Sequence, residues 1–284
     1  MSTIERVTVV GAGTMGHGIA QVAAAAGMQV FLHDVSEEDM RRGLDAVRAN
    51  LDRGVEKSKV TAQQREATLA RLHAAADLDA AVAGSDLVVE AVPESLELKH
   101  EIFERLDRVA PHEALLASNT SSLSIDKIAA ATQRPERVLG MHFFNPVHIL
   151  PLLEIVRGRR TTAQSVDRAL AVGRRMGKEP IVVRDSPGFA SSRLGLALGL
   201  EAMRMLEQQV ASADDIDRAM TLGYRHPMGP LRLTDRVGLD VRLAIARSLY
   251  AELGSETFRP PQILERLVAE GRLGKKSGRG FYEW

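Results

Sequence analysis

Two residues that could together remove a proton stand in neighbouring apolar segments. Glu154 interrupts the apolar run LLEIV, and His142 lies near the end of the preceding apolar run. Burying a carboxylate is costly unless it is paired, and a turn at Asn145-Pro146 would fold the segment of His142 towards Glu154. A carboxylate on one imidazole nitrogen fixes the tautomer and raises the basicity of the other. Such a pair could deprotonate an alcohol; a structural ion pair between Glu154 and Arg157 is the alternative.

A serine at the end of another apolar run could hold the oxygen that reacts. Ser118 closes the segment ALLAS and opens the polar run SNTSS. In an open α/β sheet, ligands bind outside the carboxyl ends of the strands, which is where Ser118 and His142 are expected. Ser118 could hydrogen-bond the reacting oxygen, or it could serve as an ordinary turn or cap residue. We find no HExxH or other metal-ligand spacing, and we expect no metal site.

A glycine-rich turn follows the first apolar segment. It consists of Gly11, Ala12, Gly13, Thr14, Met15 and Gly16. Gly11 permits a tight turn, Gly13 allows close approach of a pyrophosphate, and Gly16 lets the next helix pack on the sheet. Asp34 ends the next apolar segment, where a carboxylate accepts ribose hydroxyls and repels a 2′-phosphate. The pattern predicts an NAD site, and a purely structural glycine turn is the alternative.

The elements that must position these residues alternate between strand and helix. Apolar segments typical of buried strands occur at 4–10, 28–33, 86–92, 114–118, 137–144, 152–156 and 180–185. The alternation predicts an α/β domain with a doubly wound, mostly parallel sheet over 1–185. Strands stop at Ser186-Pro187-Gly188, which we take as the boundary of an all-α domain over 186–284. Its helices are expected at 189–208, 213–222, 230–253 and 261–270.

A helical hairpin insertion is expected over about 36–73, with its second helix ending near His73. Arg53, Lys57 and Lys59 cluster at the tip of this hairpin. They could clamp an anionic ligand, but basic runs are usually solvated faces, and the residues alone favour that interpretation.

Composition narrows the classes of function. The chain of 284 residues has 37 basic and 37 acidic residues, a formal net charge of zero, and no cysteine. Zero net charge disfavours nucleic acid as a partner. Absence of cysteine excludes disulfides and thiolate chemistry and fits a reducing cytoplasm. No apolar run is long enough for a membrane span, and no signal peptide is evident, so we expect a cytoplasmic protein without a membrane partner.

From residue 5 to the C-terminus the segments resemble a known family. The matching segments are GAGTMGHGIA, VVEAVPES, ASNTSSLSI, MHFFNPVHILPLLEIV, DSPGF, HPMGPLRLTDRVGLD and GRLGKKSGRGFYEW. They resemble the L-3-hydroxyacyl-CoA dehydrogenases, most closely the short, stand-alone bacterial 3-hydroxybutyryl-CoA dehydrogenases. The resemblance implies a Rossmann-like NAD domain, and a helical domain that contributes to the substrate cleft and forms a homodimer. It also implies NAD-dependent oxidation of a (3S)-3-hydroxyacyl-CoA, short in chain such as 3-hydroxybutanoyl-CoA, and the reverse reaction.

The resemblance also assigns roles to individual residues. His142 would be the catalytic base, Glu154 its orienting partner, and Ser118 the group that binds the C3 oxygen of the substrate. The residues expected to bind NAD are Gly11, Gly13, Thr14, Met15, Gly16, Asp34, Glu94, Lys99, Ser118 and Lys276. The residues expected to bind the acyl-CoA are Arg53, Lys57, Ser118, Asn145 and Ser192. By this analogy the basic hairpin becomes a clamp for the phosphates of CoA.

One position departs from the family pattern. The family commonly has Asn where this chain has Ser192, in the stretch PGFASSR. Serine also donates a hydrogen bond but is shorter, which puts the identity of the substrate in doubt more than the class of reaction. Three alternatives stay open: a 3-hydroxyadipyl-CoA dehydrogenase, a dehydrogenase of a hydroxy acid or sugar acid without CoA, and a non-catalytic protein that kept the fold, of which Ser192 would be an early sign.

Overall fold

The computed structural model describes residues 3–284. The chain divides into two compact units, one extending to Ser186 and the other comprising Pro187–Trp284. Each unit has a hydrophobic core of its own. The first unit contains the sheet and the second is helical, so the predicted fold class is confirmed.

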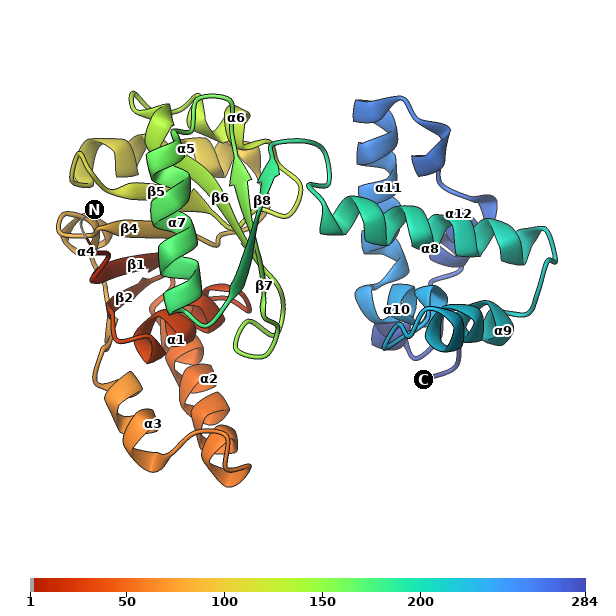
Figure 1. Cartoon of the computed structure of the whole chain (residues 1–284), viewed down its shortest axis with the longest axis horizontal. Coiled ribbons are helices and arrows are strands. Elements are labelled where there is room, and N and C mark those ends of the chain that lie inside the picture. The colour runs from red at the N-terminus through yellow and green to blue at the C-terminus, as the bar shows by residue number, and fades with distance from the viewer. Residues whose placement is uncertain (1–2) are drawn as a thin grey trace. The chain divides into compact units, whose positions relative to one another are not determined.

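The first unit is built on one eight-stranded sheet (Figure 1). Its strands are β1 (Arg6–Val10), β2 (Gln29–His33), β3 (Leu72–Ala74), β4 (Leu87–Glu90), β5 (Leu115–Ser118), β6 (Val138–Phe143), β7 (Leu152–Arg157) and β8 (Glu179–Arg184). The order across the sheet is β3-β2-β1-β4-β5-β6-β7-β8. Strands β3 to β6 pair in parallel, whereas β7 is antiparallel to β6. The chain therefore turns back after β6, as the Asn145-Pro146 turn led us to expect.

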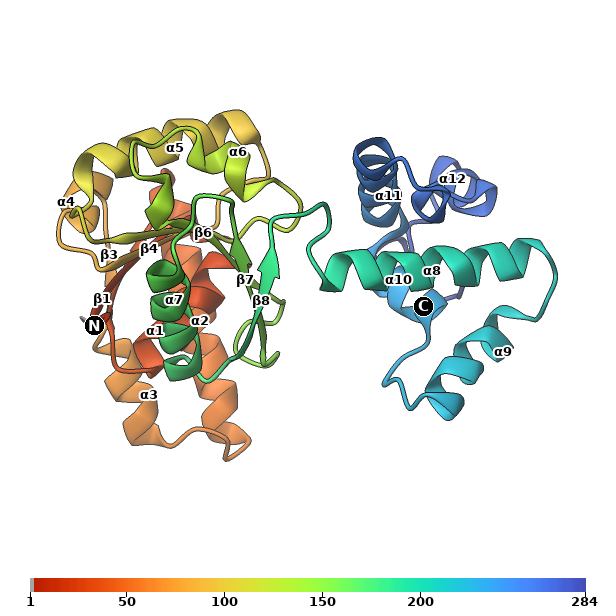
Figure 2. The same cartoon turned by 45° about the horizontal axis from the view of Figure 1, so that its top comes forward.

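Helices cover both faces of the sheet (Figures 1 and 2). They are α1 (Gly16–Ala25), α2 (Glu37–Glu56), α3 (Ala62–Leu69), α4 (Leu78–Val82), α5 (Leu96–Val109), α6 (Ile125–Ala129) and α7 (Ala163–Arg175). Helices α1 and α7 lie on one face, and α4, α5 and α6 lie on the other. Apolar side chains of α1 and α7, including Ile19 and Val172, join the central strands in one buried cluster. Packing of these helices on both faces holds the strands together in the sheet. The order of the strands then decides which residues lie next to one another at the edge of the sheet.

The hairpin differs in part from the expected one. Ser36 caps α2 by accepting a hydrogen bond from the backbone of Asp39, and Thr61 caps α3 in a capping box with Gln64. Helix α3 ends at Leu69, however, and His73 lies in the short strand β3 beside β2. Strand β3 is too short to show an alternating apolar pattern in the sequence, so the sequence analysis did not predict it. Helix α4 was not predicted either.

The second unit consists of helices around their own core. They are α8 (Ser191–Glu207), α9 (Ala213–Arg218), a π-helical turn (Ala219–Gly223), α10 (Pro230–Val237), α11 (Leu239–Leu253) and α12 (Gln262–Ala269). We expected one helix over 230–253, and this was wrong. Gly238 has φ +106°, which no helix accommodates, so the helix breaks there into α10 and α11.

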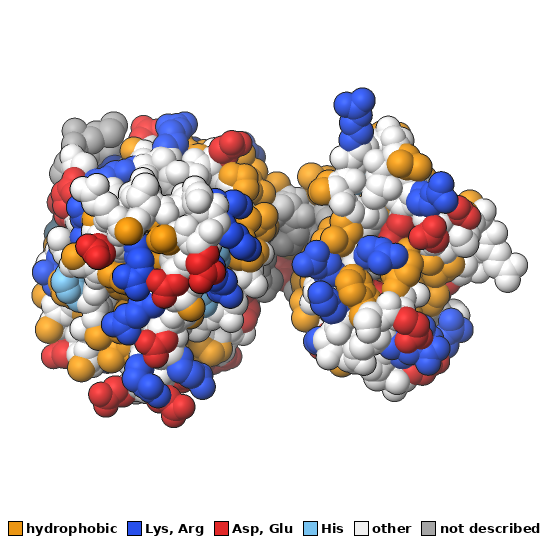
Figure 3. All heavy atoms as spheres, turned by 90° about the horizontal axis from the view of Figure 1, so that it is seen from below, with side chains coloured by type: hydrophobic (Ala, Val, Ile, Leu, Met, Phe, Trp, Pro, Cys, Tyr) orange, Lys and Arg blue, Asp and Glu red, His pale blue; other side chains and the backbone are white. Residues whose placement is uncertain are grey.

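The surface carries charges of both signs. On the face seen from below, basic and acidic side chains are interspersed in both units (Figure 3). Within residues 3–284, no helix combines the length and the apolar character needed to cross a membrane.

Candidate active site

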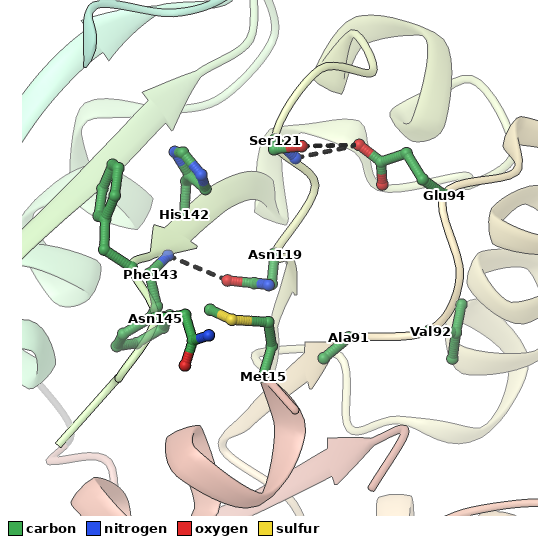
Figure 4. Close-up of a pocket in the computed structure, with 10 residues that line it drawn as sticks. Met15, Ala91, Val92, Glu94, Asn119, Ser121, His142, Phe143 and Asn145 are labelled. Atoms are coloured by element: carbon green, nitrogen blue, oxygen red, sulfur yellow. Dashed lines mark hydrogen bonds between the residues drawn. The ribbon is translucent and has the colours of Figure 1, made fainter. Parts of the chain in front are cut away.

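A pocket of about 370 Å³ lies at the carboxyl edge of the sheet in the first unit. Its walls come from the segments that follow β1, β4 and β5 and from the end of β6 (Figure 4). Met15 at the start of α1, Asn119 after β5 and His142 of β6 all face it. The parallel strands bring these distant segments to one edge, where ligands of open α/β sheets bind.

The glycine turn fits the pyrophosphate of a dinucleotide. Gly11 has φ +99°, and a Cβ there would lie 2.7 Å from the carbonyl oxygen of Ala91. At Gly16 a Cβ would meet the Gly11 oxygen at 1.7 Å, so only glycine allows the helix to start so close to the turn. Gly13 faces open space, with no atom within 4 Å of an added Cβ. A phosphate could approach this backbone at the N-terminus of α1.

Asp34 lies just beyond β2, where the sequence placed it. Its carboxylate accepts hydrogen bonds from the backbone N–H of Ala12 at 2.7 Å and of Ser36 at 3.2 Å. These bonds fix the carboxylate against the glycine turn and leave lone pairs on both oxygens for other donors. The arrangement fits the ribose of an adenosine.

His142 and Glu154 form the expected pair. They are directly opposite in the β6–β7 ladder, so both side chains leave the same face of the sheet. The Nδ1 atom of His142 lies 2.8 Å from Oε2 of Glu154, which is completely buried. The predicted alternative for Glu154, an ion pair with Arg157, is not formed: Arg157 donates to the carbonyl of Thr161 instead. The carboxylate orients the imidazole, whose ring lines the pocket.

A second buried carboxylate, Glu90, holds Ser118. The two residues are partners in the β4–β5 ladder. The Ser118 hydroxyl donates to Glu90 at 2.6 Å, and the Lys99 ammonium donates to the other Glu90 oxygen, also at 2.6 Å. All three side chains are at most 1 % exposed. Ser118 and Lys99 are therefore held by the same carboxylate.

Glu94 ties the loop after β5 to the start of α5. Its carboxylate accepts from the backbone N–H of Ser121 and of Ser122 and from the hydroxyl of Thr120. Burial raises the pKa of this carboxyl, but these hydrogen bonds and the Lys99 ammonium outweigh burial and hold the pKa below its ordinary value. Glu94 is thus an anion at neutral pH on the rim of the pocket, as Figure 4 shows.

The remaining predicted residues lie in three places. Asn145 lines the pocket beside Met15. Arg53 and Lys57 are exposed at the end of α2, in the hairpin that projects from the sheet. Ser192 and Lys276 belong to the second unit: Ser192 is half-buried in α8, and Lys276 pairs with Asp240 at 2.6 Å.

Two residues of this edge were missed by the sequence analysis. Glu90 interrupts the apolar run DLVVEAV, which is the same signal that singled out Glu154. Asn119 accepts a hydrogen bond from the backbone N–H of Phe143 and so connects the ends of β5 and β6. No local sequence signal distinguishes this asparagine from a turn residue. Within residues 3–284, no cluster of three potential ligands could hold a metal ion.

Family models match almost the whole chain. The model described as the NAD binding domain of 3-hydroxyacyl-CoA dehydrogenase matches residues 6–186. The model described as the C-terminal domain of 3-hydroxyacyl-CoA dehydrogenase matches residues 188–284.

Full-length relatives carry related names. The 3-hydroxybutyryl-CoA dehydrogenase of Mycobacterium tuberculosis is 45% identical, with 99% of each chain aligned. The 3-hydroxyadipyl-CoA dehydrogenase of Escherichia coli is 44% identical over the whole of this chain, which covers 60% of that protein. The crystal structure of (S)-3-hydroxybutyryl-CoA dehydrogenase from Ralstonia eutropha is 41% identical and superposes with a TM-score of 0.96 over 99% of both chains.

Proposed function

The chain belongs to the 3-hydroxyacyl-CoA dehydrogenase family, and from this membership we propose how its residues carry out the family reaction. The protein is an NAD-dependent oxidoreductase that converts a (3S)-3-hydroxyacyl-CoA to the 3-oxoacyl-CoA and back. The observation that carries the residue assignment is the His142–Glu154 hydrogen bond at the edge that also holds the glycine turn.

His142 is proposed as the general base. Its Nδ1 faces Glu154, and its Nε2 is proposed to take the hydroxyl proton of the substrate. The Glu154 carboxylate stabilises the imidazolium that results. NAD⁺ supplies the acceptor for the hydride that leaves C3. In the reverse direction the imidazolium returns its proton to the C3 oxygen.

Ser118 is proposed to hold the C3 oxygen of the substrate. Its hydroxyl donates to Glu90 in the structure. To donate to the substrate, the hydroxyl hydrogen must turn from Glu90 to the C3 oxygen, a rotation about one bond. Glu90 thus keeps Ser118 in place and offers an alternative acceptor when no substrate is bound.

Asp34 and the glycine turn, with Thr14 and Met15, are proposed to bind NAD. The support is the backbone that opens at Gly13 and the fixed carboxylate of Asp34. Glu94 and Lys276 are proposed as further contacts of the cofactor. Lys99 is buried and pairs with Glu90 and Glu94. We therefore propose that its charge influences the NAD site through these two carboxylates.

The acyl-CoA is proposed to contact both units. Within residues 3–284, neither Arg53 nor Lys57 forms an ion pair with an acidic residue. Both exposed side chains therefore suit the phosphates of CoA. Asn145 is proposed to face the acyl end from the pocket, and Ser192 to meet the carbonyl side of the substrate from α8. The second unit, 186–284, is thereby proposed to contribute to the substrate site.

A short acyl chain, as in 3-hydroxybutanoyl-CoA, is the proposed substrate. Relatives named for 3-hydroxybutyryl-CoA support it, although the relative named for 3-hydroxyadipyl-CoA has nearly the same identity. The test is NADH consumption with 3-oxoacyl-CoA esters of increasing length, repeated with NADPH. The highest kcat/KM is expected with acetoacetyl-CoA and NADH. Absence of turnover with every ester would refute the proposed function.

We further propose a cytoplasmic homodimer. The cysteine-free composition fits a reducing compartment. The second unit exposes large apolar side chains, with Leu194, Leu222 and Tyr224 each more than 70 % exposed. These exposed side chains support an interface on this unit, and sedimentation of the purified chain would measure its mass in solution.

A further inference from the structure

The loop between β6 and β7 is fastened to the first unit on both sides of an exposed histidine. The side chain of Val147 is buried, and a Cβ added at Gly18 of α1 would lie 2.8 Å from the Val147 Cβ, so the loop packs directly on this helix. The buried ammonium of Lys178 donates to the carbonyl oxygens of Val147 and of Leu150, the latter at 2.9 Å. His148 lies between these two anchored residues, and its side chain is exposed. The loop therefore holds His148 in a defined place on the surface.

Two helices carry further basic groups to this place. His17 directly precedes Gly18 on α1. Gln21, one turn along the same face of α1, accepts a hydrogen bond from the side-chain amide of Asn50 on α2 at 3.2 Å. The side-chain oxygen of Asn50 in turn accepts from the guanidinium of Arg53. The face of α1 that carries His17 is thus the face that α2 approaches with Arg53.

The imidazole of His148 is surrounded by groups of positive charge. Its pKa is lowered, first by desolvation and then by the charges of Arg53, His17 and Lys178. These three groups come from α2, from α1 and from the residue before β8, so they approach His148 from three elements. Within residues 3–284, no acidic side chain forms an ion pair with His17, His148 or Arg53. An anion bound among these groups would relieve their mutual repulsion.

We propose that His17, His148 and Arg53 together bind a phosphate of CoA, and that His148 takes up a proton when this phosphate binds. The inference rests on the proposed function, in which Arg53 already meets the phosphates of CoA, and it adds two histidines and a dependence on pH. A protonated imidazole donates from both ring nitrogens, and a hydrogen bond from a cation to a phosphate is stronger than one between neutral groups. All of these residues belong to the first unit.

The position of His148 relative to the pocket suits a ligand of this shape. Asn145 lines the pocket and precedes His148 by three residues, a span of at most about 11 Å along the chain. A CoA ester has a pantetheine arm between its thioester and its phosphates. A substrate whose acyl end lies in the pocket can therefore reach His148 with a phosphate.

Binding of CoA should tighten as the pH falls. Without a ligand, the lowered pKa keeps His148 mostly neutral at about pH 7. A phosphate beside the ring favours the protonated form and raises this pKa, so the complex binds a proton that the free protein does not. By linkage, a complex that holds more protons than its free components is stabilised as the pH is lowered.

The test compares the binding of free CoA to the wild type and to His148→Gln by calorimetry. At about pH 7, two buffers with different heats of ionisation give the number of protons taken up, and we expect more uptake by the wild type. At about pH 6 the wild type should bind CoA about threefold to fivefold more tightly than the variant, as for an exposed ion pair. At about pH 8, where the imidazole is neutral, the difference should nearly vanish.

Three further measurements serve as controls. NADH should bind equally well to the wild type and to His148→Gln. The substrate S-acetoacetyl-pantetheine, which lacks a phosphate, should give the same KM in both proteins at the same pH. His112→Gln should match the wild type, because His112 is 81 % exposed and pairs with Glu113.

Three outcomes would overturn the proposal. Equal proton uptake and equal affinity for CoA in the wild type and in His148→Gln would remove the phosphate site. A loss of NADH affinity as large as the loss for CoA would assign the phosphate to the cofactor instead. An equal rise in KM for S-acetoacetyl-pantetheine would show that His148 acts on the loop and not on a phosphate. None of these affects the proposed function, which fails only if the wild type does not reduce acetoacetyl-CoA with NADH.

Discussion

The hydroxyl of Ser118 donates a 2.6 Å hydrogen bond to the buried carboxylate of Glu90. The same carboxylate receives the ammonium of Lys99. The position of Ser118 at the edge of the sheet therefore depends on a buried charge pair, Glu90 and Lys99. Glu90 would act through Ser118 and Lys99 as a positioning residue.

Replacing Glu90 with Gln should impair both stability and turnover. The change leaves the Lys99 ammonium with only Glu94, at 3.4 Å. Removing one partner of a buried pair costs about 3–5 kcal/mol, and Ser118 loses its charged acceptor. Urea denaturation and NADH consumption measure the two effects. Glu104→Gln on the exposed side of α5 is the control. Stability within about 0.5 kcal/mol of the wild type would contradict this account of the pair.

Glu94 should make the protein sensitive to acid. Hydrogen bonds from Thr120 and Ser122 and the charge of Lys99 outweigh burial, so the pKa is lowered from its ordinary 4.5. The folded state therefore favours the carboxylate. This contribution to stability is present above pH 4.5 and is lost as pH falls through the lowered value. Glu94→Gln should lose less stability than the wild type between pH 5 and about pH 3, measured by urea unfolding, and identical slopes would refute the assignment.

Replacing Asp34 with Ala should weaken NAD and reduce the discrimination against NADP. The carboxylate that accepts from Ala12 and Ser36 is lost, and with it the acceptor for the ribose and the charge that repels a 2′-phosphate. We expect KM for NADH to rise by about tenfold or more, as for a lost charged hydrogen bond, with a smaller change for NADPH. Glu37→Ala, in the first turn of α2, is the control. An unchanged ratio of kcat/KM for the two cofactors would rule out Asp34 as the ribose residue.

The basic end of α2 should bind the nucleotide part of CoA. The double substitution Arg53→Ala and Lys57→Ala should raise KM for acetoacetyl-CoA, and less so at high salt, where exposed charges are screened. The thioester of N-acetylcysteamine, which lacks the nucleotide, should be unaffected. Arg48→Ala, which removes an exposed arginine paired with Asp45 on the same helix, is the control. Equal effects on both thioesters would argue against the clamp.

Strong local patterns made most of the first unit predictable. The β-branched runs and the glycine turn located the sheet edge, and a carboxylate in an apolar strand singled out Glu154. The same reasoning applied to Glu90 would have found it, but its serine and lysine partners are 28 and 9 residues away and meet it only through sheet pairing and helix packing.

Tertiary contacts decided the features that the sequence analysis missed. Strand β3 has three residues and exists because it adds to β2. The helix breaks at Gly238 because that residue has a positive φ. The pattern of apolar residues gives no sign of the break, since it continues from α10 into α11.

The central claim, that His142 is the base of an NAD-dependent hydroxyacyl-CoA dehydrogenase, is tested most directly by one comparison. The turnover of acetoacetyl-CoA with NADH is measured for the wild type and for His142→Ala, with NADH affinity determined separately. His112→Ala, at a histidine whose side chain is 81 % exposed, is the control. We predict a loss of at least about a hundredfold in kcat with NADH affinity nearly unchanged. Turnover like that of the wild type in His142→Ala would contradict the claim.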